Sequence, residues 1–95
     1  MRVIFEAQIR EESVDDAKAF FLKVIPDARE YDGCLYSGLF QSEKEPTSLL
    51  MVEDWETQAH HKKYLAWCTR SGMLRELLRY LSGPPTLRYY RTMDL

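Results

Sequence analysis

Three neighbouring residues in the second half of the chain could take part in proton transfer. His60 and His61 are the only imidazoles in the sequence, and imidazole is the side chain whose ordinary pKa suits proton transfer near neutral pH. Tyr64 can donate or accept a hydrogen bond, although a phenol pKa of about 10 makes it a poor base at neutral pH. Helical spacing groups His60 with Tyr64 and Trp67, so we take Tyr64 and His60 as the candidate catalytic residues. Surface or capping roles remain the structural alternatives, and spacing leaves open which of His60, His61 and Tyr64 faces a pocket.

Five further residues could bind a flat aromatic ligand. Trp55 is the last residue of a predicted strand. Its indole could stack on a ligand ring as part of a pocket wall, or it could be a core residue that packs at that corner of the fold. Trp67 and Arg70 could close a pocket or anchor a break in a helix, and Gln8 offers an amide for handling a proton or an oxygen. The candidate binding residues are therefore Trp55, Trp67, Gln8, Tyr36 and Arg70.

Other kinds of reactive site find little support. Cys34 and Cys68 are far apart and lack a Cys-x-x-Cys partner, so we expect reduced thiols, and with two histidines they match no common zinc spacing. No Ser/His/Asp set, paired-carboxylate motif or glycine-rich phosphate loop is present. We therefore expect no metal site.

Length and composition narrow the class of protein. The 95 residues, of which 45% are hydrophobic and 29% charged, predict one globular domain spanning residues 1–95. No apolar run approaches the roughly 20 residues that cross a bilayer, and the first residues do not form a signal peptide. A net charge of −2 argues against nucleic-acid binding. We expect a cytoplasmic protein that binds neither membrane nor nucleic acid.

Hydrophobic periodicity predicts strands and helices in the order βαββαβ. Ser13 begins the first helix, with Asp16 in capping-box position, Pro26 kinking the helix or starting its last turn, and Gly33 in the left-handed conformation that closes it. Thr57 caps the second helix, and a further helical run begins at Ser71. The expected strands are 2–10, 34–42, 47–55 and 87–91, the last at an edge or starting beside Pro85. This order predicts an α+β, ferredoxin-like fold: a four-stranded antiparallel sheet with helices on one face.

The second and third strands predict self-association. Residues 34–42 and 47–55 are apolar on both sides, whereas a sheet with one solvated face alternates apolar and polar residues. A chain of this length has no spare element to cover the second face, but another copy of the chain can do so. We therefore expect a homodimer.

Four segments carry a resemblance to a known family. They are Tyr31-Asp32-Gly33-Cys34-Leu35, Val52-Glu53-Asp54-Trp55-Glu56, the broken helix from Ala66 to Leu81, and Ser82-Gly83-Pro84-Pro85. Together they resemble the antibiotic biosynthesis monooxygenase (ABM) domain family of the dimeric α/β-barrel superfamily. The resemblance covers nearly the whole chain, and the Glu-Asp-Trp-Glu segment is its most specific part.

The resemblance implies a homodimer in which two sheets face each other as a barrel, with a pocket between sheet and helices in each subunit. It also implies an enzyme that oxidises a quinol or phenolic aromatic with O2 without metal or flavin. Tyr64 stands where many members have a histidine. The chain has no asparagine and has Leu74 where the haem-binding branch has a histidine ligand, which argues against haem degradation. The alternatives are a non-catalytic homodimer that binds or senses a small molecule, and an interaction domain whose pocket is filled by its own side chains.

Overall fold

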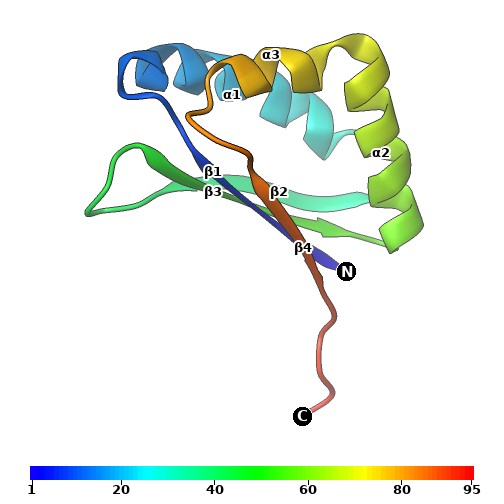
Figure 1. Ribbon diagram of the computed structural model, residues 1–95. Coiled ribbons are helices and arrows are strands. Elements are labelled where there is room, and N and C mark those ends of the chain that lie inside the picture. Colours follow the sequence, from blue (N-terminus) through cyan, green and yellow to red (C-terminus); the bar gives the residue numbers. More distant parts are fainter.

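The computed structural model describes residues 1–95 as a sheet covered on one side by helices (Figure 1). The strands lie in the order β2-β3-β1-β4 and every neighbouring pair is antiparallel, which confirms the ferredoxin-like arrangement. No helix is both long and apolar enough to span a bilayer. The elements along the chain are β1 (Arg2–Gln8), the short 3₁₀ turn η1 (Glu11–Ser13), α1 (Val14–Arg29), β2 (Cys34–Gln41), β3 (Ser48–Trp55), α2 (Gln58–Ser71), α3 (Met73–Arg79) and β4 (Thr86–Tyr90).

The beginning and the end of α1 differ in how well the sequence predicts them. The prediction of a capping box at the start of α1 is wrong. Ser13 is the last residue of η1, and its side chain makes no capping hydrogen bond. Pro26 is the fourth residue counted back from the end of the helix, at the start of the last turn, where its missing amide hydrogen removes one hydrogen bond of the helix. Gly33 has φ +86° and turns the chain into β2 as expected.

The second helical region is divided into α2 and α3 by one residue. The Thr57 hydroxyl accepts a hydrogen bond from the amide of His60 and caps α2. Gly72 then adopts φ +84°, a conformation that disfavours other residues. As a result, α2 runs down one side of the molecule while α3 crosses beside α1 (Figure 1).

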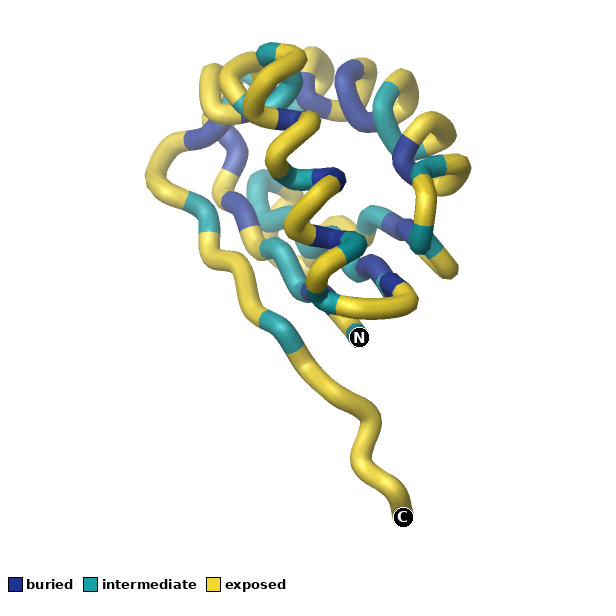
Figure 2. Tube along the Cα trace, turned by 90° about the vertical axis from the view of Figure 1, so that its right-hand side faces the viewer, coloured by how far each residue is buried: buried dark blue, intermediate teal, exposed yellow.

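Buried residues gather between the helices and the sheet (Figure 2). They form two clusters, one around Phe20, Phe21 and Leu77, and the other around Trp55 and Tyr64. The period of two along a strand sends alternate residues of β1 and β3 into this layer. Residues of both clusters line the cavity that lies between the helices and the sheet.

The other side of the sheet, which we call the open face, carries no helix. Its apolar centre is formed by Ile4 opposite Val52 and by Phe40 opposite Leu50. Large rings remain uncovered there, since Phe40 is 49% exposed in the isolated chain. Monomeric proteins seldom leave such a contiguous apolar surface uncovered.

Candidate functional site

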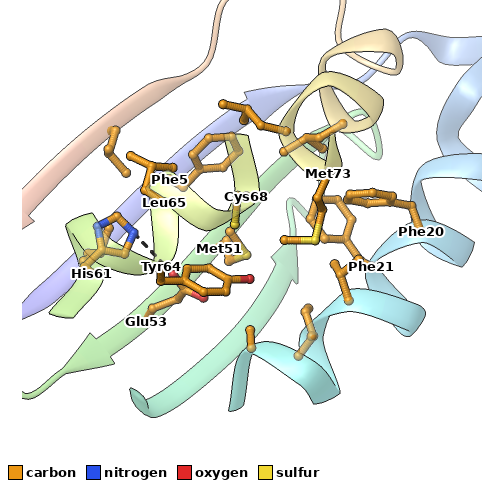
Figure 3. Close-up of a pocket in the computed structure, with 17 residues that line it drawn as sticks. Phe5, Phe20, Phe21, Met51, Glu53, His61, Tyr64, Leu65, Cys68 and Met73 are labelled. Atoms are coloured by element: carbon orange, nitrogen blue, oxygen red, sulfur yellow. Dashed lines mark ion pairs between the residues drawn. The ribbon is translucent and has the colours of Figure 1, made fainter. Parts of the chain in front are cut away.

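A cavity of ≈ 80 Å³ lies between the sheet and the three helices (Figure 3). Every element except β2 and η1 contributes to it, and 15 of its 17 lining residues are hydrophobic. The lining consists of Val3, Phe5, Phe20, Phe21, Val24, Ile25, Ala28, Met51, Glu53, His61, Tyr64, Leu65, Cys68, Met73, Leu74, Leu77 and Leu87. The lining includes one carboxyl group, that of Glu53, and one imidazole, that of His61, and these two groups lie together at one end of the cavity (Figure 3).

Glu53 is a carboxyl group inside the core. It occupies an inward position of β3, two residues before Trp55, and is only 3% exposed. The hydroxyl of Ser37 donates to its Oε2 at 3.0 Å, and the indole of Trp55 donates to its Oε1 at 3.3 Å. Burial raises the pKa of Glu53, an effect that these two hydrogen bonds partly oppose because they favour the charged form.

His61 faces Glu53 from the first turns of α2. Its Nδ1 lies 2.9 Å from the hydroxyl of Tyr89, within hydrogen-bond distance, whereas its Nε2 lies 3.8 Å from Glu53 Oε1, which is too long for a hydrogen bond. The residue is 3% exposed. Burial lowers the pKa of His61 to about 4, so the imidazole is neutral at neutral pH.

Tyr64 presents its ring and hydroxyl to the cavity from the next turn of α2 (Figure 3). Its ring packs against Trp55 and Tyr31, with centroids 5.1 and 4.9 Å away. Burial raises the pKa of Tyr64 above its ordinary value, and it raises the pKa of the neighbouring Cys68 thiol to about 11. Both groups are therefore protonated at neutral pH, and Tyr64 can donate a hydrogen bond but cannot serve as a base.

The two tryptophans and Arg70 do not line the cavity. Trp55 is completely buried and supports Tyr64 and Glu53 from behind. Trp67 is 36% exposed and stacks on the outer side of Tyr64, with ring centroids 6.1 Å apart. Arg70 is an exposed residue of α2.

Gln8 and Tyr36 lie on the opposite side of the sheet from the cavity. Alternation along β1 turns Val3, Phe5 and Ala7 inward and Gln8 outward, and the Gln8 amide donates to Ser48 Oγ at 3.1 Å. A β-bulge between Cys34 and Tyr36 shifts the alternation of β2, and Tyr36 is 44% exposed on the open face. Within one chain, neither residue can contact a ligand in the cavity.

The expectation that His60 shares the inward face with Tyr64 is corrected by the structure. The buried residues of α2 are His61, Tyr64 and Cys68. His60 points outward: its Nδ1 lies 2.6 Å from Thr57 Oγ1, and its Nε2 lies 3.5 Å from Glu56 Oε2. The Thr57 cap fixes the start of the helix, and this start determines that residue 61 faces the sheet.

Sequence reasoning did not select Glu53 or His61 for the site, although one signal for Glu53 was available. In β3, alternation turns residues 51, 53 and 55 toward the helices, so the sequence itself places the carboxyl group of Glu53 in the core. A charged residue is seldom buried without a hydrogen-bonding or charged partner. For His61 no such signal exists, because spacings 60-64-67 and 61-64-68 both fit a helix.

The arrangement suits binding and proton transfer more than metal chemistry. No group of three or more His, Cys, Asp and Glu side chains is placed to hold a metal ion. An apolar enclosure with a carboxyl, an imidazole and a phenol at its wall can orient the polar group of a small ring, exchange a proton with it and exclude water from it.

Comparison with solved structures shows where this fold occurs. The chain is similar to a crystal structure of an antibiotic biosynthesis monooxygenase, with a TM-score of 0.89, 18% identity and coverage of 98% of both chains. It is also similar to a conserved protein from Methanosarcina mazei, with a TM-score of 0.89, 21% identity and coverage of 97% of this chain and 91% of that chain. A protein from Mycobacterium tuberculosis gives a TM-score of 0.87 at 17% identity, covering 99% of this chain and 95% of that chain.

These identities are low, so the likeness shows the fold alone. A search of curated proteins finds no match. The sequence profile of the antibiotic biosynthesis monooxygenase family, however, matches residues 1–67, which include β1 through most of α2 and therefore Glu53, His61 and Tyr64. The chain belongs to the antibiotic biosynthesis monooxygenase family.

Proposed function

We propose that this protein is a cofactor-independent monooxygenase that oxidises a small phenol or quinol with O2 in the cavity between sheet and helices. One observation carries the proposal: an apolar enclosure whose polar groups are gathered at one end. Such an enclosure binds an aromatic ring through its apolar walls and orients the ring through its hydroxyl group. Family membership supports the monooxygenase class.

The reaction balances without a redox cofactor. A phenol with a free para carbon and one O2 molecule give a quinone and one water, so that one oxygen atom enters the product and the substrate supplies all four electrons. Deprotonation makes the ring electron-rich, and the protein contributes a dry site that favours the phenolate and keeps O2 near it. In this proposal the Tyr64 hydroxyl donates a hydrogen bond that orients the substrate.

Cavity size limits the substrate. A volume of ≈ 80 Å³ is below the roughly 150 Å³ that holds a benzene molecule and the roughly 300–1,000 Å³ of pockets for drug-sized ligands. A single ring therefore requires some lining side chains to move outward, and a polycyclic substrate requires more. Met51 and Met73, both on the lining, are the flexible side chains best suited to such movement.

The proposal includes a homodimer formed through the open face. The exposed rings of Tyr36, Phe40 and Tyr90, together with the half-buried Ile4, Leu50 and Val52, supply the apolar surface. Burying them against a second copy leaves the cavity of each subunit intact, because the cavity lies on the other side of the sheet. Gln8 and Tyr36 then belong to the subunit interface.

Oxygen uptake tests the activity. Purified protein treated with a chelator is mixed with single-ring and two-ring phenols and hydroquinones, and O2 consumption is followed with an electrode. We expect faster consumption than in buffer for at least one electron-rich ligand. The matched controls are Ala28→Leu, which fills the cavity and should abolish the acceleration, and Lys62→Ala, an exposed change on α2 that should not.

The result also separates the two candidate functions. Saturable ligand binding without O2 consumption across the series would reject the oxygenase and favour a homodimer that binds or senses a small molecule. The absence of both binding and uptake would favour a subunit-interaction domain.

A further inference from the structure

One nitrogen of the buried imidazole has no hydrogen-bond partner within the chain. His61 Nδ1 is engaged by Tyr89, but Nε2 has only Glu53 Oε1 nearby, at 3.8 Å. We propose that Glu53 and His61 form an acid–base site for the hydroxyl group of a phenolic ligand, in which Glu53 removes the proton and neutral His61 holds the resulting phenolate. This inference rests on the proposed function and assigns the residues that ionise its substrate.

The spacing of the two atoms suits one ligand oxygen. An oxygen that makes ordinary hydrogen bonds of about 2.8 Å to two atoms can reach both when they are less than about 5.6 Å apart. Glu53 Oε1 and His61 Nε2, 3.8 Å apart, meet this condition. Both residues line the cavity, and the dashed line in Figure 3 marks the contact between them at one end of it.

The neighbours of His61 determine which nitrogen carries its hydrogen. Glu53 Oε1 can only accept when the carboxyl is ionised, so a hydrogen on Nε2 is attracted by it while a lone pair there is repelled. The Tyr89 hydroxyl can then donate to Nδ1 over the 2.9 Å between them. Tyr89 is therefore a positioning residue, which fixes the tautomer and the ring orientation without touching the ligand.

The proton step conserves the charge of the site. The ligand O–H bond breaks, a new O–H bond forms at Glu53 Oε1, and the electron pair remains on the ligand oxygen. The negative charge thus moves from carboxylate to phenolate, where the Nε2–H group of His61 donates to it. Burial favours both roles, because the raised pKa of Glu53 strengthens it as a base and the lowered pKa of His61 keeps it a neutral donor.

The other groups around the pair are compatible with these roles. Ser37 and Trp55 donate to the carboxylate and hold it in place. Tyr64 and Cys68, from α2, are protonated at neutral pH because burial raises the pKa of each. No Lys or Arg makes an ion pair with Glu53, so the carboxylate is not neutralised by a permanent cation.

The experiment compares a ligand that has the hydroxyl group with one that lacks it. Binding of 4-nitrophenol and of nitrobenzene is measured by calorimetry at pH 6, where most of the nitrophenol in solution still carries its hydroxyl hydrogen; neither electron-poor ring needs to react with O2, so the measurement is independent of turnover. We expect wild-type protein to prefer nitrophenol, and we expect Glu53→Gln and His61→Phe each to reduce this preference about tenfold, the usual effect of losing one charge-assisted hydrogen bond. Lys62→Ala should retain the preference, and thermal unfolding shows whether each variant is folded.

A second measurement uses the wild-type protein alone. Nitrogen-15 NMR of the imidazole at pH 7 should show His61 neutral, with its hydrogen on Nε2, and addition of 4-nitrophenol should shift the Nε2 signal more than the Nδ1 signal. A charged His61, the other tautomer, or equal binding of the two ligands by wild-type protein would overturn the inference. Hydroxyl preference without O2 uptake would retain the acid–base site and reject only the oxygenase.

Discussion

His60 and His61 are adjacent in the chain, yet only the imidazole of His61 points into the core, because successive residues of a helix point about 100° apart. His60 contacts Thr57 and Glu56 at the surface, while His61 is 3% exposed between Glu53 and Tyr89. Because His61 is buried, we expect its protonation to be coupled to folding and to ligand binding.

The first prediction concerns stability at acidic pH. Burial holds the pKa of His61 at about 4, below its ordinary 6.5, so as the pH falls from 6.5 to 4 the unfolded chain binds a proton that the folded chain does not. The contribution of neutral His61 to the free energy of unfolding is complete above pH 6.5. It is lost as the pH falls from 6.5 to 4, and the loss is roughly 3 kcal/mol at most. Urea unfolding at several pH values should show a shallower pH dependence for His61→Phe than for wild type.

The effect of Glu53 on the pH dependence of stability is opposite to that of His61. Its pKa is raised above 4.5, so the stability linked to its neutral form is complete below pH 4.5 and decreases as the pH rises through the folded pKa. Glu53→Gln removes this opposing contribution and should make the remaining dependence on His61 steeper. An unchanged pH profile in both variants would contradict the assignment of buried, titrating groups.

The second prediction concerns assembly. Phe40→Asp or Val52→Asp places a charge in the centre of the open face, where a subunit interface would bury it without a partner. Light scattering of wild-type protein at micromolar concentration should give twice the chain mass of 11.3 kDa, and either variant should give the monomer or precipitate. The interface should exceed the roughly 1,200–2,000 Å² typical of stable complexes. An 11.3 kDa wild-type particle would reject the dimer.

The third prediction concerns Tyr64. Tyr64→Phe retains the ring contacts with Trp55 and Tyr31 but removes the hydroxyl from the cavity. If this hydroxyl orients the substrate in the transition state, O2 uptake should fall about tenfold, or about 1.4 kcal/mol, with little change in stability. Unchanged turnover would exclude Tyr64 from the mechanism.

The fourth prediction compares two glycines with nearly the same conformation. Gly33 and Gly72 have φ +86° and +84°, where a side chain costs about 1–2 kcal/mol. A Cβ on Gly33 would also collide with the imidazole of His60, whereas a Cβ on Gly72 would meet no atom within 4 Å. Chemical denaturation should therefore show a larger loss for Gly33→Ala than for Gly72→Ala, and equal losses would mean that His60 moves aside freely.

The sequence predicted the elements better than the site, for a physical reason. Period-two alternation specifies both the existence of β1 and the face that it buries, because a shift of one residue would expose Val3 and bury Glu6. In α2 the apolar and aromatic residues are spread so broadly that two helical phases fit, and the phase selected by the fold brings His61 inward. The open-face position of Tyr36 depends on a β-bulge, which no local pattern of that strand indicates.

The fifth prediction concerns cavity size. Met73 lies on the lining at the start of α3, so Met73→Ala should enlarge the space for a ring and destabilise the empty protein by about 1–2 kcal/mol, less than for a fully buried methionine. Binding of naphthols, measured by fluorescence, should strengthen relative to binding of phenols. A variant that weakens binding of both ring sizes equally would show that Met73 does not limit the space.

The cavity draws its chemistry and its shape from different parts of the fold. Glu53, His61 and Tyr64 come from β3 and α2, whereas α1 and α3 contribute only apolar side chains to the lining. Substitutions on the cavity-facing sides of α1 and α3 should therefore change which molecules the cavity accepts while its polar groups stay in place, and laboratory evolution of new specificity should begin with those two helices.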